Sequence, residues 1–345
     1  MIMRLLMSAN AFYPDVGGYE RVAYMLASEL AIRGHEVKVV TFSRGGADEG
    51  LPFEIYRRPN FSMLMSLLRW SDLYVQNNVS FKLLWPLLFC RRPLVFIHHG
   101  FYHRSIHTRF SLRYRMKHFA TLFAINVSVS RAVANTLPGK SHIILNAYRD
   151  DLFFRIPNIP KSSDIFFVGR IVSDKGVDLL VDAIAILRGR GLMPSVTLAG
   201  SGPEESALRK KVSELGLERS VTFVGRVSDE RLNELLNAHK IMVVPTREGE
   251  GFGVVALEGI ACGCVVVGSN DGGLPEAIGR CGRTFRTGDS EALADTLQEL
   301  LSDRESWEEY LVHAERHLSG MRPSVVVDKY EEIFRTALGR EGKVD

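Results

Sequence analysis

The sequence predicts an α/β protein made of two doubly wound parallel sheets, one following the other along the chain. Its 345 residues are about twice the length of a typical single domain. Short apolar strands alternate with amphipathic helical patterns in both halves, and glycine-rich turns follow several strands, which is typical of parallel βαβ units. A composition of 46% hydrophobic and 24% charged residues argues against disordered, collagen-like and disulfide-scaffold classes.

The first domain is expected over residues 1–155. An apolar strand from Met3 leads to a glycine turn, and the helix that follows ends at Gly34. Because a strand–helix–strand crossover is right-handed, the strands of this domain are expected to run parallel. The later strands are expected at 37–42, 73–75, 94–97, 123–129 and 143–145. A basic segment at 102–119 lies between the strands at 94–97 and 123–129.

The second domain is expected over residues 156–322, after a linker at 150–163 whose two prolines break the periodicity. Strands are expected at 165–168, 196–199, 221–224, 241–244, 265–268 and 283–285, with helices at 177–190, 204–215 and 230–238 between them. Helices from about 292 to 338 close the chain. The last of these, within 323–345, is expected to pack back on the first domain.

The net charge of +3 hides a strong asymmetry between the two domains. Through Arg155 the chain carries 20 Lys and Arg against 10 Asp and Glu, whereas the remainder carries 23 against 30. The 77 residues from Leu73 to Arg149 contain no acidic side chain. A domain this basic is expected to meet an anionic partner, although proteins that are merely soluble also carry basic surfaces.

Several other kinds of site are not indicated. The four cysteines, at 90, 262, 264 and 281, lack paired spacing, so reduced thiols are expected rather than zinc ligands or disulfides. Gly200-Ser201-Gly202 lacks the third glycine of a dinucleotide fingerprint and is interpreted as a tight turn. No nucleic-acid-binding motif is present.

No membrane span or secretory signal is expected either. The longest apolar run, 83–89, contains Pro86 and is far shorter than the roughly 20 residues that cross a bilayer. The expected location is therefore cytoplasmic, with peripheral attachment to the inner face of the plasma membrane as a further possibility.

Two cations follow the first strand of the second domain. Arg170 and Lys175 lie five residues apart in the loop after 165–168, just before a helix. Ligands of open parallel sheets bind at the carboxyl ends of strands. Cations beside the amides of a helix N-terminus suit a diphosphate, whereas most loop cations elsewhere are simply solvated.

A glycine-rich loop at 245–253 follows the strand at 241–244 and precedes an apolar helix that holds Glu258. Ionised carboxylates accept hydrogen bonds from vicinal hydroxyls, as in a sugar or a ribose. A glutamate in the loop together with Glu258 therefore predicts such a site, against the alternative of one capping and one solvated glutamate.

In the first domain, Gly17 and Gly18 open the first helix, where they could approach a phosphate. His98 and His99 end the strand at 94–97, beside Gly100. A structural and a functional role are about equally expected for this pair.

These motifs, taken in order, resemble the retaining nucleotide-sugar glycosyltransferases of GT-B fold, in the large fourth family of that classification (glycosyl transferases group 1). The resemblance covers nearly the whole chain and is strongest over 165–285. It departs from the family at Asn146-Ala147-Tyr148-Arg149, where Asn-Gly-Val-Asp is common. The motifs that carry it are Gly17-Gly18-Tyr19-Glu20-Arg21-Val22, Arg33-Gly34-His35-Glu36-Val37, His99-Gly100, Val129-Ser130, Val168-Gly169-Arg170, Lys175-Gly176, Ala199-Gly200-Ser201-Gly202-Pro203-Glu204 and Glu250-Gly251-Phe252-Gly253-Val254-Val255-Ala256-Leu257-Glu258.

The resemblance implies roles for individual residues. Glu258 would bind the ribose of the donor, and Glu250 with the following backbone amides would bind the donor sugar. Arg170 and Lys175 would neutralise the diphosphate, and His99 would lie near the reaction centre. No metal or other cofactor is expected. The implied donor set is Gly17, Gly18, Arg170, Lys175, Glu250, Gly251, Phe252, Gly253, Val254, Val255 and Glu258, and the implied catalytic set is Glu250, His99, Arg170 and Lys175.

We therefore expect an enzyme that moves a hexose or N-acetylhexosamine, with retention, from a UDP- or GDP-sugar such as GDP-mannose. The acceptor is expected to be a lipid-linked or anionic glycan in cell-surface polysaccharide, lipopolysaccharide or glycolipid synthesis. The alternatives are a non-catalytic, nucleotide-sugar-binding partner subunit and a UDP-amino-sugar epimerase of the same fold. The residues expected to contact the acceptor or an anionic membrane are Arg104, Arg109, Arg113, Arg115 and Lys117.

Overall fold

The structure, a computed structural model, describes residues 2–14, 17–45, 48–102, 112–303 and 306–339. The chain divides into two compact units. Unit 1 comprises Met1–Ala147 together with Pro323–Asp345, and unit 2 comprises Tyr148–Arg322. The division thus falls after Ala147, and the segment from Tyr148 to Arg155 belongs to unit 2 rather than to the first domain.

Unit 1 is built on a seven-stranded sheet in the order β3-β2-β1-β4-β5-β6-β7. Every described strand pair in it is parallel; Leu5, for example, lies opposite Val37 on one side and Leu73 on the other. The strand order reverses between β1 and β4, and this switch point is where ligands of such sheets bind. The strands are β1 (Arg4–Ala9), β2 (Glu36–Thr41), β3 (Glu54–Arg57), β4 (Leu73–Asn77), β5 (Leu94–His98), β6 (Ile125–Ser128) and β7 (His142–Ile143).

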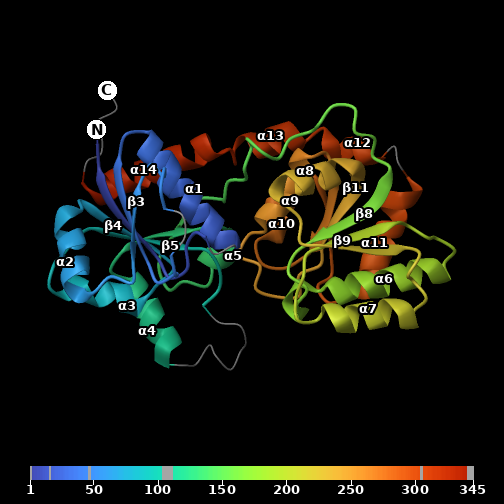
Figure 1. Cartoon of the computed structure of the whole chain (residues 1–345), viewed down its shortest axis with the longest axis horizontal. Coiled ribbons are helices and arrows are strands. Elements are labelled where there is room, and N and C mark those ends of the chain that lie inside the picture. Colours follow the sequence, from blue (N-terminus) through green and yellow to red (C-terminus); the bar gives the residue numbers. More distant parts are fainter. Residues whose placement is uncertain (1, 15–16, 46–47, 103–111, 304–305, 340–345) are drawn as a thin grey trace. The chain divides into compact units, whose positions relative to one another are not determined.

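Helices cover both faces of this sheet (Figure 1). Helix α1 begins at Gly18, directly after its N-cap Gly17, and buries Val22, Leu26 and Leu30 at the spacing that the sequence predicts. The 3-10 helix η1 (Trp85–Leu88) continues directly from α3. The α-helices are α1 (Gly18–Ile32), α2 (Phe61–Trp70), α3 (Phe81–Leu84), α4 (Leu112–Thr121), α5 (Arg131–Ala134) and α14 (Pro323–Ala337).

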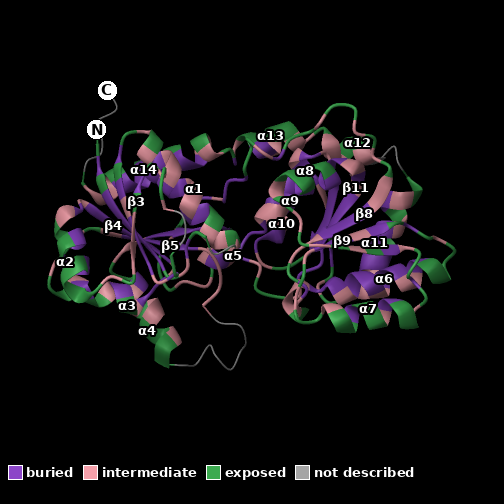
Figure 2. Cartoon of the chain, viewed as in Figure 1, coloured by how far each residue is buried: buried purple, intermediate pink, exposed green. Residues whose placement is uncertain are grey.

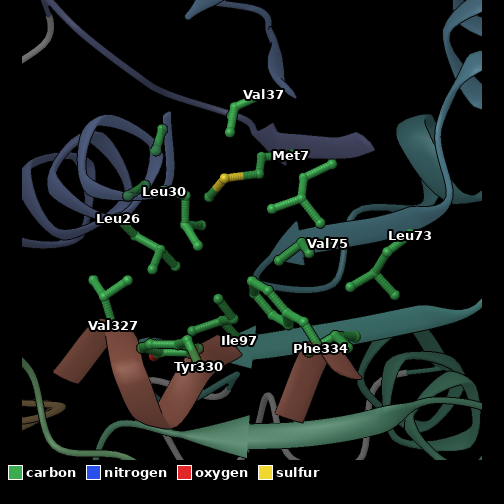
Figure 3. Close-up of a cluster of buried hydrophobic side chains, with 14 of the residues drawn as sticks. Met7, Leu26, Leu30, Val37, Leu73, Val75, Ile97, Val327, Tyr330 and Phe334 are labelled. Atoms are coloured by element: carbon green, nitrogen blue, oxygen red, sulfur yellow. The ribbon is translucent and has the colours of Figure 1, made fainter. Parts of the chain in front are cut away.

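Helix α14 comes from the far end of the chain and completes the core of unit 1. Its Val327, Tyr330 and Phe334 are buried among side chains of α1 and the sheet, such as Leu26 and Ile97 (Figure 3). At the rim, the Arg33 guanidinium donates to Asp328 (2.6 Å) and Glu331 (3.0 Å). An apolar face and a charged edge therefore fix this helix against α1.

Unit 2 is a six-stranded sheet in the order β10-β9-β8-β11-β12-β13, and its described pairs are also all parallel. Its four central strands are mainly buried, whereas its edge strands are partly exposed, and its helices expose their outer faces (Figure 2). The predicted fold class, two doubly wound parallel sheets, is confirmed. The strands are β8 (Ser163–Val168), β9 (Val196–Ala199), β10 (Val221–Gly225), β11 (His239–Val244), β12 (Val265–Ser269) and β13 (Gly282–Phe285). The helices are η3 (Ser173–Lys175), α6 (Val177–Gly189), α7 (Glu205–Glu214), α8 (Asp229–Ala238), α9 (Val254–Ala261), α10 (Leu274–Ile278), α11 (Ser290–Ser302), α12 (Ser306–Leu311) and α13 (Ala314–Ser319).

Candidate active site

The switch point of unit 2 lies between β8 and β11, and the two loops singled out in the sequence follow these strands. The first loop runs through η3 to Gly176, which caps α6 in a left-handed conformation (φ 64°). A Cβ atom at Gly176 would overlap the carbonyl oxygen of Pro245. Glycine at this position lets the two loops approach each other closely.

The two loops meet in an ion pair. Lys175 Nζ lies 2.6 Å from Glu250 Oε2, and Thr246 Oγ1 is 3.5 Å from the same oxygen. The lysine side chain is 31% exposed and the glutamate side chain 16% exposed. The pair is therefore reachable from solvent, and its two charges stand where a ligand can contact both.

A second ion pair, between Arg247 and Asp178, also joins the second loop to the first loop and the start of α6. The Arg247 guanidinium donates to both carboxylate oxygens of Asp178 (2.5 and 2.6 Å), and the Arg247 amide donates to the carbonyl of Asp174 (2.9 Å). Burial alone would raise the pKa of Asp178, but the hydrogen bonds and charge of Arg247, with smaller contributions from the Asp178 backbone amide and the charge of Lys211, together lower it. Arg247 was not among the predicted site residues, because no sequence motif distinguishes it from other loop arginines.

The glycine-rich loop is also held on its other side. The Gly273 amide donates to the Glu250 carbonyl (2.9 Å), which ties the loop to the turn before α10. Gly251 and Phe252 are buried, and the Phe252 side chain is 1% exposed. Gly253 caps α9, so that Val254 and Val255 form its first turn. Phe252 therefore fills the interior of unit 2, and any contact it makes with a ligand would come from its backbone.

Glu258 lies on α9 and is 7% exposed. Burial disfavours the charge of Arg149, but the hydrogen bonds that it donates to Asp151 and the charges of Asp151, Asp229 and Glu258 together raise the pKa of this arginine. The Arg149 guanidinium also lies 3.0 Å from Asp229 Oδ2. The residue that departs from the family motif thus belongs to a charge cluster around Glu258.

Arg170 is the one predicted donor-site cation that the structure leaves apart from this pair. It is exposed, and among the described residues no hydrogen bond or ion pair joins it to another side chain. It lies on the same loop as Lys175, directly after Gly169 at the end of β8.

In unit 1, His98 is a structural residue. Asn126 Oδ1 can only accept, so His98 Nε2 donates to it (2.9 Å). His98 Nδ1 then accepts from the Tyr102 hydroxyl (2.5 Å), which in turn accepts from the Val79 amide (3.0 Å). Burial lowers the pKa of His98 to about 4. This low pKa keeps the ring neutral. Because both ring nitrogens are hydrogen-bonded within the fold, neither is left to bind a ligand.

His99 differs from its neighbour. Its Nε2 donates to Asn77 Oδ1 (2.8 Å) and its backbone amide donates to Asn78 Oδ1 (3.0 Å), whereas Nδ1 has no hydrogen-bond partner among the described residues. Burial, and secondarily the charge of His98, lower its pKa to about 3. His99 is therefore a neutral ring with one acceptor nitrogen to offer.

The first turn of α1 lies beside His99. The Tyr19 and His99 rings have centroids 5.9 Å apart, and Tyr19 directly follows Gly18. The structure thus brings Gly17, Gly18 and His99 together in unit 1. Asn77 and Asn78, which orient His99, were not predicted; the available signal was a pair of asparagines at the carboxyl end of a strand at the switch point.

The predicted basic segment is described only in part. Arg113, Arg115 and Lys117 lie on α4, while Arg104 and Arg109 fall outside the described residues. Across the part of the chain that the structure describes, no three His, Cys, Asp or Glu side chains are gathered so that they could hold a metal ion. None of the described helices is long and apolar enough to cross a bilayer.

Two family models match the chain. Residues 149–316 match "Glycosyl transferases group 1", and residues 16–144 match "Glycosyltransferase Family 4". The chain belongs to the group 1 glycosyltransferases. The two matches meet near the division between the units and include every predicted donor-site residue of unit 2.

Similar proteins agree with this family. The chain is 40% identical over 140 residues to D-inositol 3-phosphate glycosyltransferase of Mycobacteroides abscessus, which covers 40% of this chain and 31% of that protein. It is 24% identical over 335 residues to the phosphatidylinositol N-acetylglucosaminyltransferase gpi3 subunit of Schizosaccharomyces pombe, covering 86% of this chain and 72% of that protein. The match therefore spans about a third of the first relative.

A solved structure shows the same fold. The Anabaena protein HepE, in complex with UDP and glucose, superimposes with a TM-score of 0.80 at 22% identity, covering 97% of this chain and all of that one. Each unit of this glycosyltransferase is thus one of the Rossmann-like domains of a GT-B fold, as the resemblance implied.

Proposed function

We propose that this glycosyltransferase moves a hexose or N-acetylhexosamine from a UDP- or GDP-sugar to a lipid-linked or anionic glycan acceptor, with retention of anomeric configuration. The observation that carries the proposal is the partly exposed pair of Lys175 and Glu250, with Glu258 on the helix that follows. A cation, a sugar-binding carboxylate and a ribose-binding carboxylate thereby stand at the carboxyl edge of one sheet.

The roles follow from the charges. Glu258 would accept hydrogen bonds from the ribose hydroxyls, and Glu250 from hydroxyls of the donor sugar. Lys175 and Arg170 would face the diphosphate together with the amides that begin α6 and α9. The complex of HepE with UDP and glucose supports a donor of this class.

In the transfer step, the bond between the anomeric carbon and the diphosphate oxygen breaks while the acceptor hydroxyl bonds to that carbon from the same face. The proton of the hydroxyl passes to the leaving phosphate oxygen, so no protein base is needed. Negative charge grows on the diphosphate as the bond breaks, and fixed cations lower the barrier by stabilising it. We propose that these cations act without a metal.

His99 is proposed to lie near the reaction centre and to contact a sugar hydroxyl. A neutral imidazole whose Nδ1 lacks a partner can accept a hydrogen bond from a sugar hydroxyl, and the Asn77 and Asn78 contacts hold the ring in place for it. Its low pKa keeps it uncharged at neutral pH, so it would position the sugar rather than transfer a proton.

An anionic acceptor is supported by the basic unit 1 and by two relatives whose names specify an inositol phosphate and a phosphatidylinositol. We further propose that unit 1 contacts a membrane surface at the cytoplasmic leaflet. Helix α4 exposes Met116 and Phe119 among Arg113, Arg115 and Lys117. Aromatic residues interleaved with cations suit the interface of an anionic bilayer.

A second exposed apolar surface supports the same contact. The rings of Phe61 and Trp85 stack at 4.9 Å, Phe89 meets both edge-on, and Leu88 beside them is 82% exposed. Exposed clusters of this kind mark interaction surfaces rather than ordinary protein surface.

Two measurements test the function. Thermal unfolding in the presence of UDP-glucose, UDP-N-acetylglucosamine and GDP-mannose should reveal the donor, since a ligand that binds the native state raises its stability. Incubation of that donor with candidate acceptors, followed by proton NMR of the product, should show the anomeric configuration of the donor retained. An inverted product would refute the retaining mechanism, and epimerised free sugar without an acceptor would favour the epimerase alternative.

A further inference from the structure

A cavity of about 300 Å³ opens at the switch point of unit 1. The segments that follow β1, β2 and β4 contribute Asn10, Phe42 and Ser80 to its lining, and the charged members come from α3 and α4. Those helices lie side by side at one end of unit 1 (Figure 1). The cavity thus occupies the place where a doubly wound sheet binds its ligand.

All charged residues that line the cavity are cations. Lys82, Arg113 and Lys117 all line it, and none of its lining residues is acidic. Within the described chain, no carboxylate pairs with any of these three side chains. Instead, Lys82 Nζ lies 5.6 Å from the centre of the Phe42 ring and Lys117 Nζ lies 4.7 Å from the centre of the Tyr102 ring. An aromatic face holds an ammonium group in place without neutralising it.

Two of the cations repel each other. Arg113 and Lys117 are four residues apart on α4, on the same side of the helix. Burial, and secondarily the charge of Arg113, lower the pKa of Lys117. This clustering costs stability unless an anion occupies the space between the cations.

The polar part of the cavity is rigid. Gln76 accepts from the Ser80 amide (2.8 Å) and donates to the Ser80 carbonyl (3.3 Å), and the Tyr102 hydroxyl holds the Val79 amide (3.0 Å). The Ser80 hydroxyl in turn donates to Asn10 Oδ1 (2.7 Å). A cradle fixed in advance loses little conformational entropy when a ligand binds.

The same loop leads to the candidate reaction centre. Asn78, two residues before Ser80, accepts a hydrogen bond from the backbone amide of His99. A group held in the cavity would therefore lie near His99, because the loop after β4 lines the cavity and also holds this histidine through Asn78.

We propose that this cavity binds a phosphate group of the acceptor, held by Lys82, Arg113 and Lys117 with Ser80 and Asn10 at its polar wall. The inference rests on the proposed function and specifies its acceptor. Three cations from two helices match a group with up to two negative charges and at least three acceptor oxygens, whereas one arginine satisfies a carboxylate. The phosphate belongs either to a soluble phosphorylated molecule or to the headgroup of a lipid.

The test measures binding of two phosphate probes without a donor present. Calorimetric titration with sn-glycerol 3-phosphate examines the soluble source, and co-sedimentation with vesicles of phosphatidic acid in phosphatidylcholine examines the lipid source. The variants are Lys82→Met and Lys117→Met. Lys140→Met is the matched control, because Lys140 is exposed in unit 1 at the opposite, amino end of β7 and does not line the cavity.

Lys82→Met and Lys117→Met should each weaken binding of at least one probe about tenfold, as expected for the loss of one charge-assisted hydrogen bond. Lys140→Met should stay within about twofold of the wild type, and Lys82→Arg and Lys117→Arg should retain most of the affinity. A soluble phosphate is indicated if glycerol 3-phosphate binds, and a headgroup if only the vesicles do.

The proposal is overturned if neither probe binds the wild-type protein, or if the two cavity variants lose no more affinity than Lys140→Met. Titration of the same variants with UDP and GDP separates this failure from failure of the proposed function. Retained nucleotide binding with no effect of the cavity variants removes the phosphate site alone, whereas a wild-type protein that binds no nucleotide contradicts the glycosyl transfer itself.

Discussion

The ion pair between Lys175 and Glu250 predicts opposite effects for the two partners. In the free protein the carboxylate compensates the cation that is proposed to hold the diphosphate, so Glu250→Gln should release Lys175 and remove a nearby negative charge. UDP or GDP without a sugar should then bind more tightly to Glu250→Gln, while Lys175→Met should bind it more weakly. Transfer of the sugar should nevertheless fall about 100-fold in Glu250→Gln, because the sugar hydroxyls lose their acceptor.

The size of the effect follows from the exposure of the pair. With side chains 31% and 16% exposed, the pair contributes about 1 kcal/mol, near the upper end of the range for surface ion pairs. Its release should tighten nucleotide binding about fivefold. Loss of a charge-assisted hydrogen bond to phosphate in Lys175→Met costs about 1.5–3 kcal/mol, or about 10- to 100-fold in affinity.

Isothermal titration calorimetry with UDP and GDP measures these changes directly. Glu248→Gln is the control, since Glu248 is an exposed carboxylate in the same loop but lies outside the motif that runs from Glu250 to Glu258. It should bind nucleotide like the wild type. If Glu250→Gln weakens nucleotide binding as much as Lys175→Met does, Glu250 does not compete with the diphosphate for Lys175, and the reasoning is refuted.

Three further predictions concern the fold that supports the site. Burial lowers the pKa of His98 to about 4 and that of His99 to about 3, so on acidification the unfolded chain takes up protons before the native chain does. Stability to urea should therefore fall as the pH drops from about 6.5 towards 4. A flat profile would contradict the burial of both histidines as neutral rings. Gly176→Ala should lower nucleotide affinity more than tenfold by calorimetry, because its Cβ atom would collide with Pro245 and its φ is positive; unchanged affinity would mean that the loops need not meet closely. Phe334→Ala should destabilise unit 1 by about 3–5 kcal/mol in urea unfolding, as for a fully buried phenylalanine, and a loss below about 1 kcal/mol would contradict the docking of α14.

Apolar runs at the right spacing were enough to predict most strands of both sheets. The edge strand β3 was not predicted, because Glu54–Arg57 is only half-buried and has no apolar run. Strand β4 was expected to end at Val75, yet it continues through Gln76 and Asn77. These polar residues can be buried because Asn77 donates to the Ser8 carbonyl in β1 and Gln76 accepts from the Ser80 amide in the loop that follows. Periodicity in the sequence does not reveal such partners.

The same limitation explains which candidate site residues could be predicted. Lys175, Glu250 and Glu258 stand in motifs with fixed spacing, so the sequence alone makes them candidates. Lys82 was not singled out, because only the fold brings α3 and α4 to one cavity. His98 and His99 could not be told apart in the sequence, since their difference lies in the side chains that the fold brings to each ring: Tyr102 and Asn126 to His98, and Asn77 to His99.

The most direct test of the account is nucleotide binding by Glu258→Ala, with Glu248→Ala as the control. Calorimetry with the nucleotide that the wild type binds best should show a loss of at least about 100-fold for Glu258→Ala and none for the control, because the ribose hydroxyls would lose their acceptor inside a buried site. Circular dichroism should show both variants folded. Wild-type affinity in a folded Glu258→Ala variant would contradict the placement of the donor at this edge of unit 2.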